Sequence, residues 1–277
     1  MEVARSEHPA VALDGEVVVI GGLISAAPGR ISATASVEAY DPVAATWRRL
    51  PDLPQPRHHL MAAVLEGRLF ALGGYAESGF DAIDTVWELV DGTWQDRVPL
   101  PEPVGAGAAV ALDGHIYVVG GTPDGGLHRY DPVGEAWESL ASPLQRREHV
   151  AAVGFESQLW LLAGRWQGAF PTTTELYDVA SDSWAPGPSL NEARSGFGAT
   201  VISDAIWVAG GEVFDPDTSL ASVETLREGR WTRGDDLPVG LHGNPLVAVV
   251  DTVYLPGGSV RAGGVDNPGA LYALPSR

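Results

Sequence analysis

Paired glycines recur along this chain at nearly even intervals, and this recurrence constrains the fold more than any other feature of the sequence. The pairs are Gly21-Gly22, Gly73-Gly74, Gly120-Gly121, Gly210-Gly211 and Gly257-Gly258, and Ala163-Gly164 fills the one gap in the series. A tryptophan follows each of the first five of these six dipeptides, at Trp47, Trp94, Trp137, Trp184 and Trp231. Four of the five spacings fall between 43 and 47 residues, which is typical of a β-propeller. Six such dipeptides therefore predict six blades.

Each repeat begins with a predicted hairpin of two buried strands. In the second repeat, the apolar residues 60–65 are followed by the turn Glu66-Gly67 and by a second apolar run over 68–72. A continuous run with small residues suits the innermost strand of a blade, which has neighbours on both faces. A third strand ends in Tyr40, Trp87, Tyr130 or Tyr177, each seven residues before a tryptophan. We expect these tryptophans to pack between blades, with their N–H groups bonded locally.

The order of diglycine, Tyr-Asp-Pro and tryptophan, quoted from Gly120-Gly121 through Tyr130-Asp131-Pro132 to Trp137, resembles the kelch repeat. The resemblance covers essentially the whole chain. It implies an all-β, six-bladed kelch-type β-propeller, as in stand-alone bacterial kelch-like proteins. We interpret 1–277 as a single domain, with blades at about 8–50, 57–97, 104–140, 147–187, 194–234 and 241–277.

The sixth repeat departs from the pattern. Tyr272 matches the third-strand tyrosine, and the next tryptophan would fall beyond Arg277. Residues 1–5 align with the tail of the missing outer strand but are too short to replace it. We therefore predict that blade six is three-stranded or incompletely closed. A monomer is expected, and a dimer through the open edge of blade six is the alternative, because an unpaired edge can accept another strand.

Composition excludes several classes of chemistry. The chain has no cysteine, and its 17 basic residues are all arginine. Schiff-base lysines, P-loop lysines, thiolate nucleophiles, disulfides and cysteine-bound metals are therefore excluded. A net charge of −19 disfavours nucleic acids and anionic membranes as partners. With no signal peptide and no apolar run of membrane-spanning length, the sequence predicts a cytoplasmic protein.

Counting positions relative to each diglycine predicts which residues meet at one end of the propeller axis. The residues fourteen positions before each pair, which should form one ring, are Glu7, His59, Ala106, His149, Gly196 and Gly243. The residues that immediately follow each pair are Leu23, Tyr75, Thr122, Arg165, Glu212 and Ser259. Equivalent spacing in repeats implies equivalent placement, so both sets should surround the same mouth.

From these rings and their flanking loops we select candidate site residues. The candidate catalytic residues are His59, His149 and Glu212, and the candidate ligand-binding residues are Tyr75, Arg165, Trp166, Phe170, Arg30 and Arg261. Histidine titrates near neutrality and arginine binds carboxylates, so the set suits acid–base chemistry on an anion. A solvated polar rim is the alternative interpretation. No cofactor and no metal site are predicted.

In four repeats an arginine lies sixteen positions before the first residue of the diglycine or of Ala163-Gly164. These residues are Arg5, Arg57, Arg147 and Arg194. Their repetition indicates a structural role, either solvated or hydrogen-bonding between blades.

The kelch resemblance also allows the sequence to be compared with kelch-like proteins whose active or metal-binding residues are specific. A copper radical oxidase is excluded because it needs a cysteine. The iron site of plant specifier proteins is matched by Glu77 and Asp81, but Thr85 replaces the required histidine.

Three functions remain open. The first is a recognition module that binds a small molecule or a protein partner at the channel mouth. The second is a cofactor-independent isomerase, cyclase or lyase that uses the same mouth, a kind of activity found in kelch-like sugar mutarotases. The third, ranked last, is an assembly scaffold that uses the edge of blade six.

Overall fold

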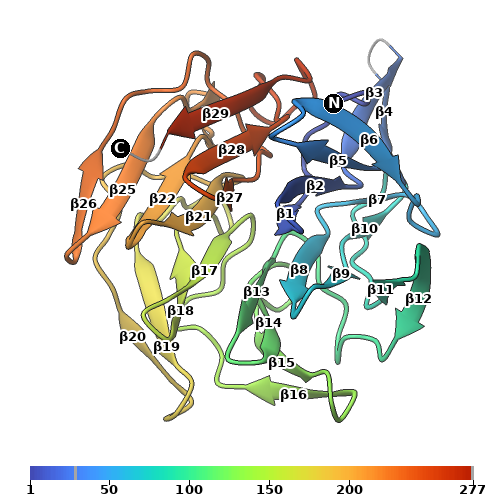
Figure 1. Ribbon diagram of the computed structural model, residues 1–277. Coiled ribbons are helices and arrows are strands. Elements are labelled where there is room, and N and C mark those ends of the chain that lie inside the picture. Colours follow the sequence, from blue (N-terminus) through green and yellow to red (C-terminus); the bar gives the residue numbers. More distant parts are fainter. Residues whose placement is uncertain (28–29, 276–277) are drawn as a thin grey trace.

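Six antiparallel sheets are arranged around a central axis like the blades of a propeller (Figure 1). The computed structural model describes residues 1–27 and 30–275. Blades one to five have four strands each, and blade six has three. The predicted six-bladed, all-β fold with a three-stranded sixth blade is therefore confirmed. Within the described ranges there is no helix, and so none that could cross a membrane.

The strands of each blade follow one another from the axis outward. Blades one and two consist of β1 (Ala10–Leu13), β2 (Glu16–Ile20), β5 (Val37–Asp41) and β6 (Thr46–Leu50), then β8 (Met61–Leu65), β9 (Arg68–Leu72), β11 (Val86–Val90) and β12 (Thr93–Arg97). Blades three and four consist of β13 (Ala108–Leu112), β14 (His115–Val119), β15 (Leu127–Asp131) and β16 (Ala136–Leu140), then β17 (Ala151–Phe155), β18 (Gln158–Leu162), β19 (Thr174–Asp178) and β20 (Ser183–Pro186).

Blade five consists of β21 (Gly198–Ile202), β22 (Ala205–Ala209), β25 (Val223–Arg227) and β26 (Arg230–Arg233), and blade six of β27 (Val247–Val249), β28 (Thr252–Pro256) and β29 (Leu271–Pro275). Three short strand pairs lie outside the blades. They are β3 (Leu23–Ala27) with β4 (Arg30–Ala33), β7 (Arg57–His58) with β10 (Tyr75–Ala76), and β23 (Glu212–Val213) with β24 (Thr218–Ser219). All three contain residues that follow a diglycine or precede an innermost strand, so they build the loops at one end of the axis.

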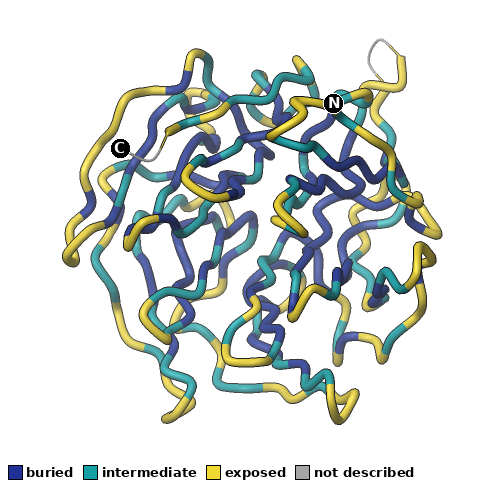
Figure 2. Tube along the Cα trace, viewed as in Figure 1, coloured by how far each residue is buried: buried dark blue, intermediate teal, exposed yellow. Residues whose placement is uncertain are grey.

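The second strand of each blade carries most of the core. In β2, residues 17–20 are completely buried, whereas most of β1 is only half-buried. The sequence pattern assigned the continuous buried run to the innermost strand. That strand lines the axial channel, so small residues suffice there and the larger apolar side chains fill the layers between blades. Figure 2 shows the same distribution, with buried segments inside and exposed turns at the rim.

The aromatic register is conserved in three blades and shifted in two. Trp47 lies directly across from Tyr40, and the same pairing recurs in blades three and four. In blade two, however, Leu89 pairs with Trp94, because a two-residue turn replaces the longer Asp-Pro turn. Leu89 therefore occupies the position that tyrosine has in blades one, three and four, and Trp87 lies two residues before it. The prediction that Trp87 is equivalent to those tyrosines was wrong. Tyr272 is shifted in the same way, because it pairs with Leu255.

The tryptophan N–H groups join neighbouring blades rather than bonding locally. The bonds run from the indole nitrogens to backbone carbonyls that follow the outer strand of the preceding blade: Trp94 to Pro51 (2.9 Å), Trp137 to Val98 (3.0 Å), Trp184 to Ala141 (2.7 Å) and Trp231 to Pro188 (2.8 Å). Within the described residues, Trp47 has no such bond. Its acceptor would follow a fourth strand of blade six, which the sheet lacks.

Three of the repeated arginines are completely buried and join successive blades. They form ion pairs with a glutamate in the third strand, as Arg5–Glu38, Arg147–Glu175 and Arg194–Glu224. The backbone carbonyl of Arg194 accepts a bond from Gly164 in blade four, while its guanidinium donates to Gly210 in blade five. Of the two structural roles that spacing left open, solvated or hydrogen-bonding between blades, these three arginines have the second. In blade two Trp87 replaces the glutamate, and the Arg57 guanidinium lies 4.8 Å from its ring centroid.

Candidate functional site

A closed ring of backbone hydrogen bonds surrounds the axis at the end formed by the loops. The six residues predicted from spacing each donate an N–H to the carbonyl of the equivalent residue in the preceding blade, over 2.6–3.0 Å: Glu7 to Gly243, His59 to Glu7, Ala106 to His59, His149 to Ala106, Gly196 to His149 and Gly243 to Gly196. All six have a positive φ between 49° and 58°. The predicted ring is confirmed, and its repeated left-handed backbone fixes where the three charged or polar side chains begin.

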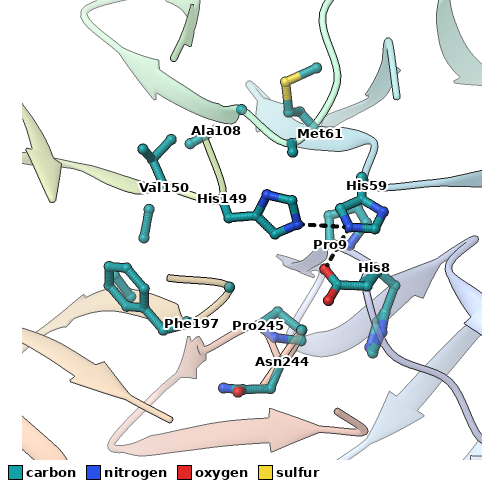
Figure 3. Close-up of a pocket in the computed structure, with 18 of the residues that line it drawn as sticks. His8, Pro9, His59, Met61, Ala108, His149, Val150, Phe197, Asn244 and Pro245 are labelled. Carbon is teal, nitrogen blue, oxygen red and sulfur yellow. Dashed lines mark hydrogen bonds and ion pairs between the residues drawn. The ribbon is translucent and has the colours of Figure 1, made fainter. Parts of the chain in front are cut away.

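Two imidazoles and a carboxylate from this ring meet at the axis. His59 Nε2 lies 3.0 Å from His149 Nε2 and 3.2 Å from Glu7 Oε2. Figure 3 shows the rings of His59 and His149 turned toward one another across the channel. All three residues are largely buried, and they stand between two cavities. The ring therefore places hydrogen-bonding side chains from three different blades at one point.

A partner stands behind each imidazole on the far side of its ring. His149 Nδ1 contacts the carboxylate of Glu148, and His59 Nδ1 lies 2.6 Å from His58 Nδ1. His58 Nε2 in turn lies 2.8 Å from the Gly79 carbonyl oxygen. These contacts fix the orientation of both axial imidazoles, as partners of functional histidines commonly do.

Arg165 ties the cluster together. Its Nε donates to Glu148 over 2.6 Å and its Nη1 donates to Glu212 over 2.6 Å. Glu212 also accepts a bond from the Gly263 N–H over 2.7 Å and lies 3.4 Å from His242 Nε2. Since two carboxylates occupy its guanidinium, Arg165 organises the cluster.

Burial dominates the electrostatics of the axial cluster. Burial raises the pKa of Glu7, and it lowers the pKa of His59 well below its ordinary value, with His149 and His58 adding to the effect. Burial also lowers the pKa of His58 to about 4. Burial alone would raise the pKa of Glu148, but His149 and Arg165 outweigh it and leave that pKa lowered. The cluster therefore favours neutral imidazoles at His58 and His59 beside a charged Glu148.

The cavity at the loop end, which we name the mouth cavity, has a volume of about 360 Å³. Its floor is formed by Glu7, His59, His149, Arg165, Glu212 and His242, and its wall includes Arg30, Phe80, Phe214 and Arg261. A smaller cavity of about 180 Å³, the axial cavity, lies on the other side of the ring and is lined mainly by small and apolar residues. The charged and polar side chains are therefore concentrated at the mouth cavity.

The structure brings six of the nine selected residues to the mouth cavity, and the other three do not line it. Those at the cavity are His59, His149, Glu212, Arg165, Arg30 and Arg261. Tyr75 is buried behind His59, with its hydroxyl 2.6 Å from Thr122 Oγ1. Trp166 turns back to pair with Ala169, and Phe170 packs edge-on against Phe214. Neither Trp166 nor Phe170 lines the cavity, whereas Phe214, which Phe170 contacts, does.

The candidate residues selected from the sequence omit three residues of the cluster, which sequence spacing would also have identified. His58, Glu148 and His242 each stand one position before a ring residue. In every blade this position forms an antiparallel backbone pair with the residue that follows the diglycine, as in Glu148 with Arg165 and His242 with Ser259. Counting fifteen positions back instead of fourteen gives all three.

Comparison with known proteins agrees with this architecture. A family model described as the Kelch motif matches residues 4–54, which contain blade one. The other blades repeat the same strand order, with three strands in blade six, and all but blade four, which has Ala163-Gly164, repeat the diglycine. The fold is a six-bladed kelch-type β-propeller, and blade one carries the kelch motif. The solved structure of YjhT superimposes on this kelch propeller with a TM-score of 0.82 and 16% identity over 98% of both chains, which is a likeness of fold.

Curated kelch proteins match shorter segments. Kelch-like protein terF of Aspergillus terreus is 30% identical over 31% of this chain, and human Kelch-like protein 33 is 41% identical over 27% of it. An F-box/kelch-repeat protein of Arabidopsis thaliana is 30% identical over 31% of it. The matched segments span only 18%, 13% and 23% of those relatives. These similarities therefore concern the repeat and leave the mouth residues to be interpreted from their own geometry.

Proposed function

We propose that the mouth cavity of this kelch propeller binds a small organic anion, held by Arg30 and Arg261. Both arginines line the cavity, and neither has an ion pair or a side-chain hydrogen bond within the described residues. Arg165, by contrast, is already paired with two carboxylates. Two unpaired guanidinium groups at one opening favour a carboxylate or phosphate group as ligand. These two guanidinium groups, which have no ion pair within residues 1–27 and 30–275, are the observation that carries the proposal.

The shape of the site favours a small ligand. A volume of about 360 Å³ lies within the range of metabolite-binding pockets. The hydrogen-bonded ring forms its floor, so an extended peptide has no continuous path through the axis. A ligand whose anionic group contacts Arg30 and Arg261 would place the rest of its atoms above His59 and His149.

The enzymatic form of this proposal is a cofactor-independent isomerase, cyclase or lyase. The Glu148–His149 contact supports it, because a carboxylate behind an imidazole holds the ring so that its far nitrogen faces the ligand position. In this form His59 or His149 moves a proton on the bound anion, and Glu212 holds Arg165 in place.

A second candidate, recognition of a protein partner, is favoured by apolar side chains on the rim. Phe80 is 62% exposed and Phe214 is 38% exposed, and both border the mouth cavity. Exposed aromatic residues around a polar depression are typical anchors of protein interfaces. A partner would cover these side chains and insert an acidic group toward the arginines.

The test is a ligand titration of the purified chain by calorimetry. The ligands are a monocarboxylate, a dicarboxylate, a sugar acid, inorganic phosphate and an uncharged sugar. At least one anion should bind, and Arg261→Gln or Arg30→Gln should weaken it about tenfold or more, because a hydrogen bond to a charged group contributes about 1.5–3 kcal/mol. Arg230→Gln removes an exposed arginine of β26 and is the matched control.

Two results would contradict anion binding at the mouth. One is the absence of binding by any anion in the panel at millimolar concentration. The other is unchanged affinity in both arginine variants, which would place the anion elsewhere on the molecule.

A further inference from the structure

We propose that Glu7, His59 and His149 bind one divalent transition-metal ion at the axis. One donor atom from each of these residues lies within 4.8 Å of the other two. Two imidazole nitrogens and one carboxylate oxygen are a donor set that suits zinc or ferrous iron. This inference goes beyond the proposed function and does not depend on anion binding above the ring.

The distances between the donor atoms fit a common ion. His59 Nε2 is 3.0 Å from His149 Nε2 and 3.2 Å from Glu7 Oε2. Two atoms that each lie about 2.1 Å from one metal ion, at the angles of tetrahedral or octahedral coordination, are about 3.0–3.4 Å apart. Two of the three pairs of donor atoms therefore already have the spacing of neighbouring ligands, and the third pair, between His149 and Glu7, lies within 4.8 Å.

Contacts on the far side of His59 direct its Nε2 to the axis. The Gly79 carbonyl can only accept, so His58 Nε2 donates in the 2.8 Å bond between them. His58 Nδ1 lies 2.6 Å from His59 Nδ1, so that nitrogen of His59 already has a partner. His59 Nε2 is the nitrogen that remains for a ligand at the axis.

A contact on the far side of the ring also orients His149. Its Nδ1 faces the Glu148 carboxylate, which accepts, so Nε2 is the nitrogen that faces the axis. Arg165 Nη2 lies 3.1 Å from Nε2 and 3.3 Å from Nδ1 of this ring, and a group almost equidistant from both nitrogens faces the ring, not a lone pair in its plane. The two Nε2 atoms, 3.0 Å apart, need one proton or one metal ion between them, and a metal ion also engages the Glu7 carboxylate.

The remaining ring positions leave the metal open on one side. Ala106, Gly196 and Gly243 have no side-chain donor, and a Cβ on Gly243 would lie 2.6 Å from Glu7 Oε1. Three protein ligands and an open side toward the mouth cavity are typical of metal sites that bind an exchangeable ligand. With the metal bound, His59 and His149 are ligands, so their use as proton carriers requires the metal-free protein.

The test titrates the whole chain, stripped with a chelator, with Zn²⁺ in air and with Fe²⁺ under anaerobic conditions. We expect one equivalent to bind, no competition by Mg²⁺, which prefers oxygen ligands, and at least about 100-fold weaker binding in His59→Gln and His149→Gln. His128→Gln is the matched control, because His128 is also buried and pairs with a glutamate, Glu102, but stands outside the ring. It should bind metal like the wild type.

Failure of the wild type to bind one equivalent, or wild-type affinity in His59→Gln, overturns the proposal. If the variants do not fold, Co²⁺ added to the wild type decides, because cobalt shifts the proton NMR signals of imidazoles that ligate it. Two shifted imidazoles support the site, and none overturns it. Anion binding is titrated separately in the metal-free chain, so this proposal and the proposed function can fail independently.

Discussion

At the residue scale, single tryptophans determine how firmly one blade is attached to the next. Trp184 and Trp47 stack on a tyrosine in nearly the same way, with ring centroids 5.1 and 5.2 Å apart and interplanar angles of 46° and 44°. Trp184 also donates its N–H to Ala141 in the preceding blade, and Trp47 has no corresponding acceptor in the described chain. The two residues are thus a natural matched pair for measuring one hydrogen bond.

We expect Trp184→Phe to cost about 1 kcal/mol more than Trp47→Phe, because only the first substitution removes a hydrogen bond and leaves a carbonyl without its donor. The free energy of unfolding of both variants is measured by urea denaturation. Equal losses would mean that the bond across the blades contributes nothing beyond packing.

Glu88 makes the stability of the folded protein depend on pH, and the direction of this dependence follows from its pKa. Arg68 lowers the pKa of Glu88 most, against the opposing effect of burial, and Arg97 lowers it further below the ordinary value of 4.5. A carboxyl group with a lowered folded pKa stabilises the protein above its ordinary pKa, and the stabilisation is lost as the pH falls through the folded value. Glu88→Gln should therefore cost about 1–2 kcal/mol at pH 7 and progressively less below pH 4.5.

The measurement is the urea midpoint of wild type and Glu88→Gln between pH 3 and pH 7. Glu66→Gln, at an exposed turn, is the control and should leave the profile unchanged. A constant difference between Glu88→Gln and wild type at every pH would contradict the electrostatic origin.

At the element scale, the third strand is held to the inner strands by a buried arginine. In blades one, four and five the partner is the second residue of that strand, a buried glutamate. In blade two the corresponding residue is Trp87, and Arg57 stacks on it instead. The same position of the fold is therefore occupied by an ion pair or by a cation–π contact.

These two solutions should respond differently to loss of the arginine. Arg147→Met leaves Glu175 buried without its cation and should cost about 3–5 kcal/mol, whereas Arg57→Met loses a contact of about 0.5–2 kcal/mol. Stability is measured by urea unfolding. The double variant Arg147→Met/Glu175→Met should recover most of the loss, and a double variant as unstable as the single one would contradict this account.

At the scale of the whole molecule, the ring closes between blade six and blade one without a shared sheet. Gly258 donates its N–H to the Arg5 carbonyl over 3.0 Å, and Glu7 donates to Gly243 over 2.8 Å. No described strand pairs with the outer edge of β29. Closure therefore depends on the residues that precede β1 and on the hydrogen-bonded ring at the axis.

Amide exchange measures this open edge. In an antiparallel strand about half of the amides point to each neighbour, so about half of the amides of β29 should exchange quickly, while those of β19, which has partners on both sides, should be protected. Mass spectrometry of deuterated peptides provides the comparison. Full protection of β29 would indicate a covered edge, and loss of that protection on dilution would identify a second copy, which is the dimer alternative raised by the sequence.

The sequence by itself determined the number of blades, the short sixth blade and the residues of the axial ring. It could do so because blades are structural copies, so equal distance from a diglycine means equal position around the axis. The same count, extended by one residue, contains His58, Glu148 and His242. It failed at Trp87 and Tyr272, where turn length or strand register shifted the aromatic residue by two positions.

Only the tertiary structure decided how the side chains combine. The pairing of Arg165 with Glu148 and Glu212, and the lack of an ion pair at Arg30 and Arg261 within the described residues, depend on the directions of side chains from different blades. The approach of His59 and His149 to 3.0 Å likewise joins residues 90 positions apart. Sequence spacing sets where each backbone position lies in the ring, but rotamers and contacts between blades set which atoms meet, and these arise only when the propeller closes.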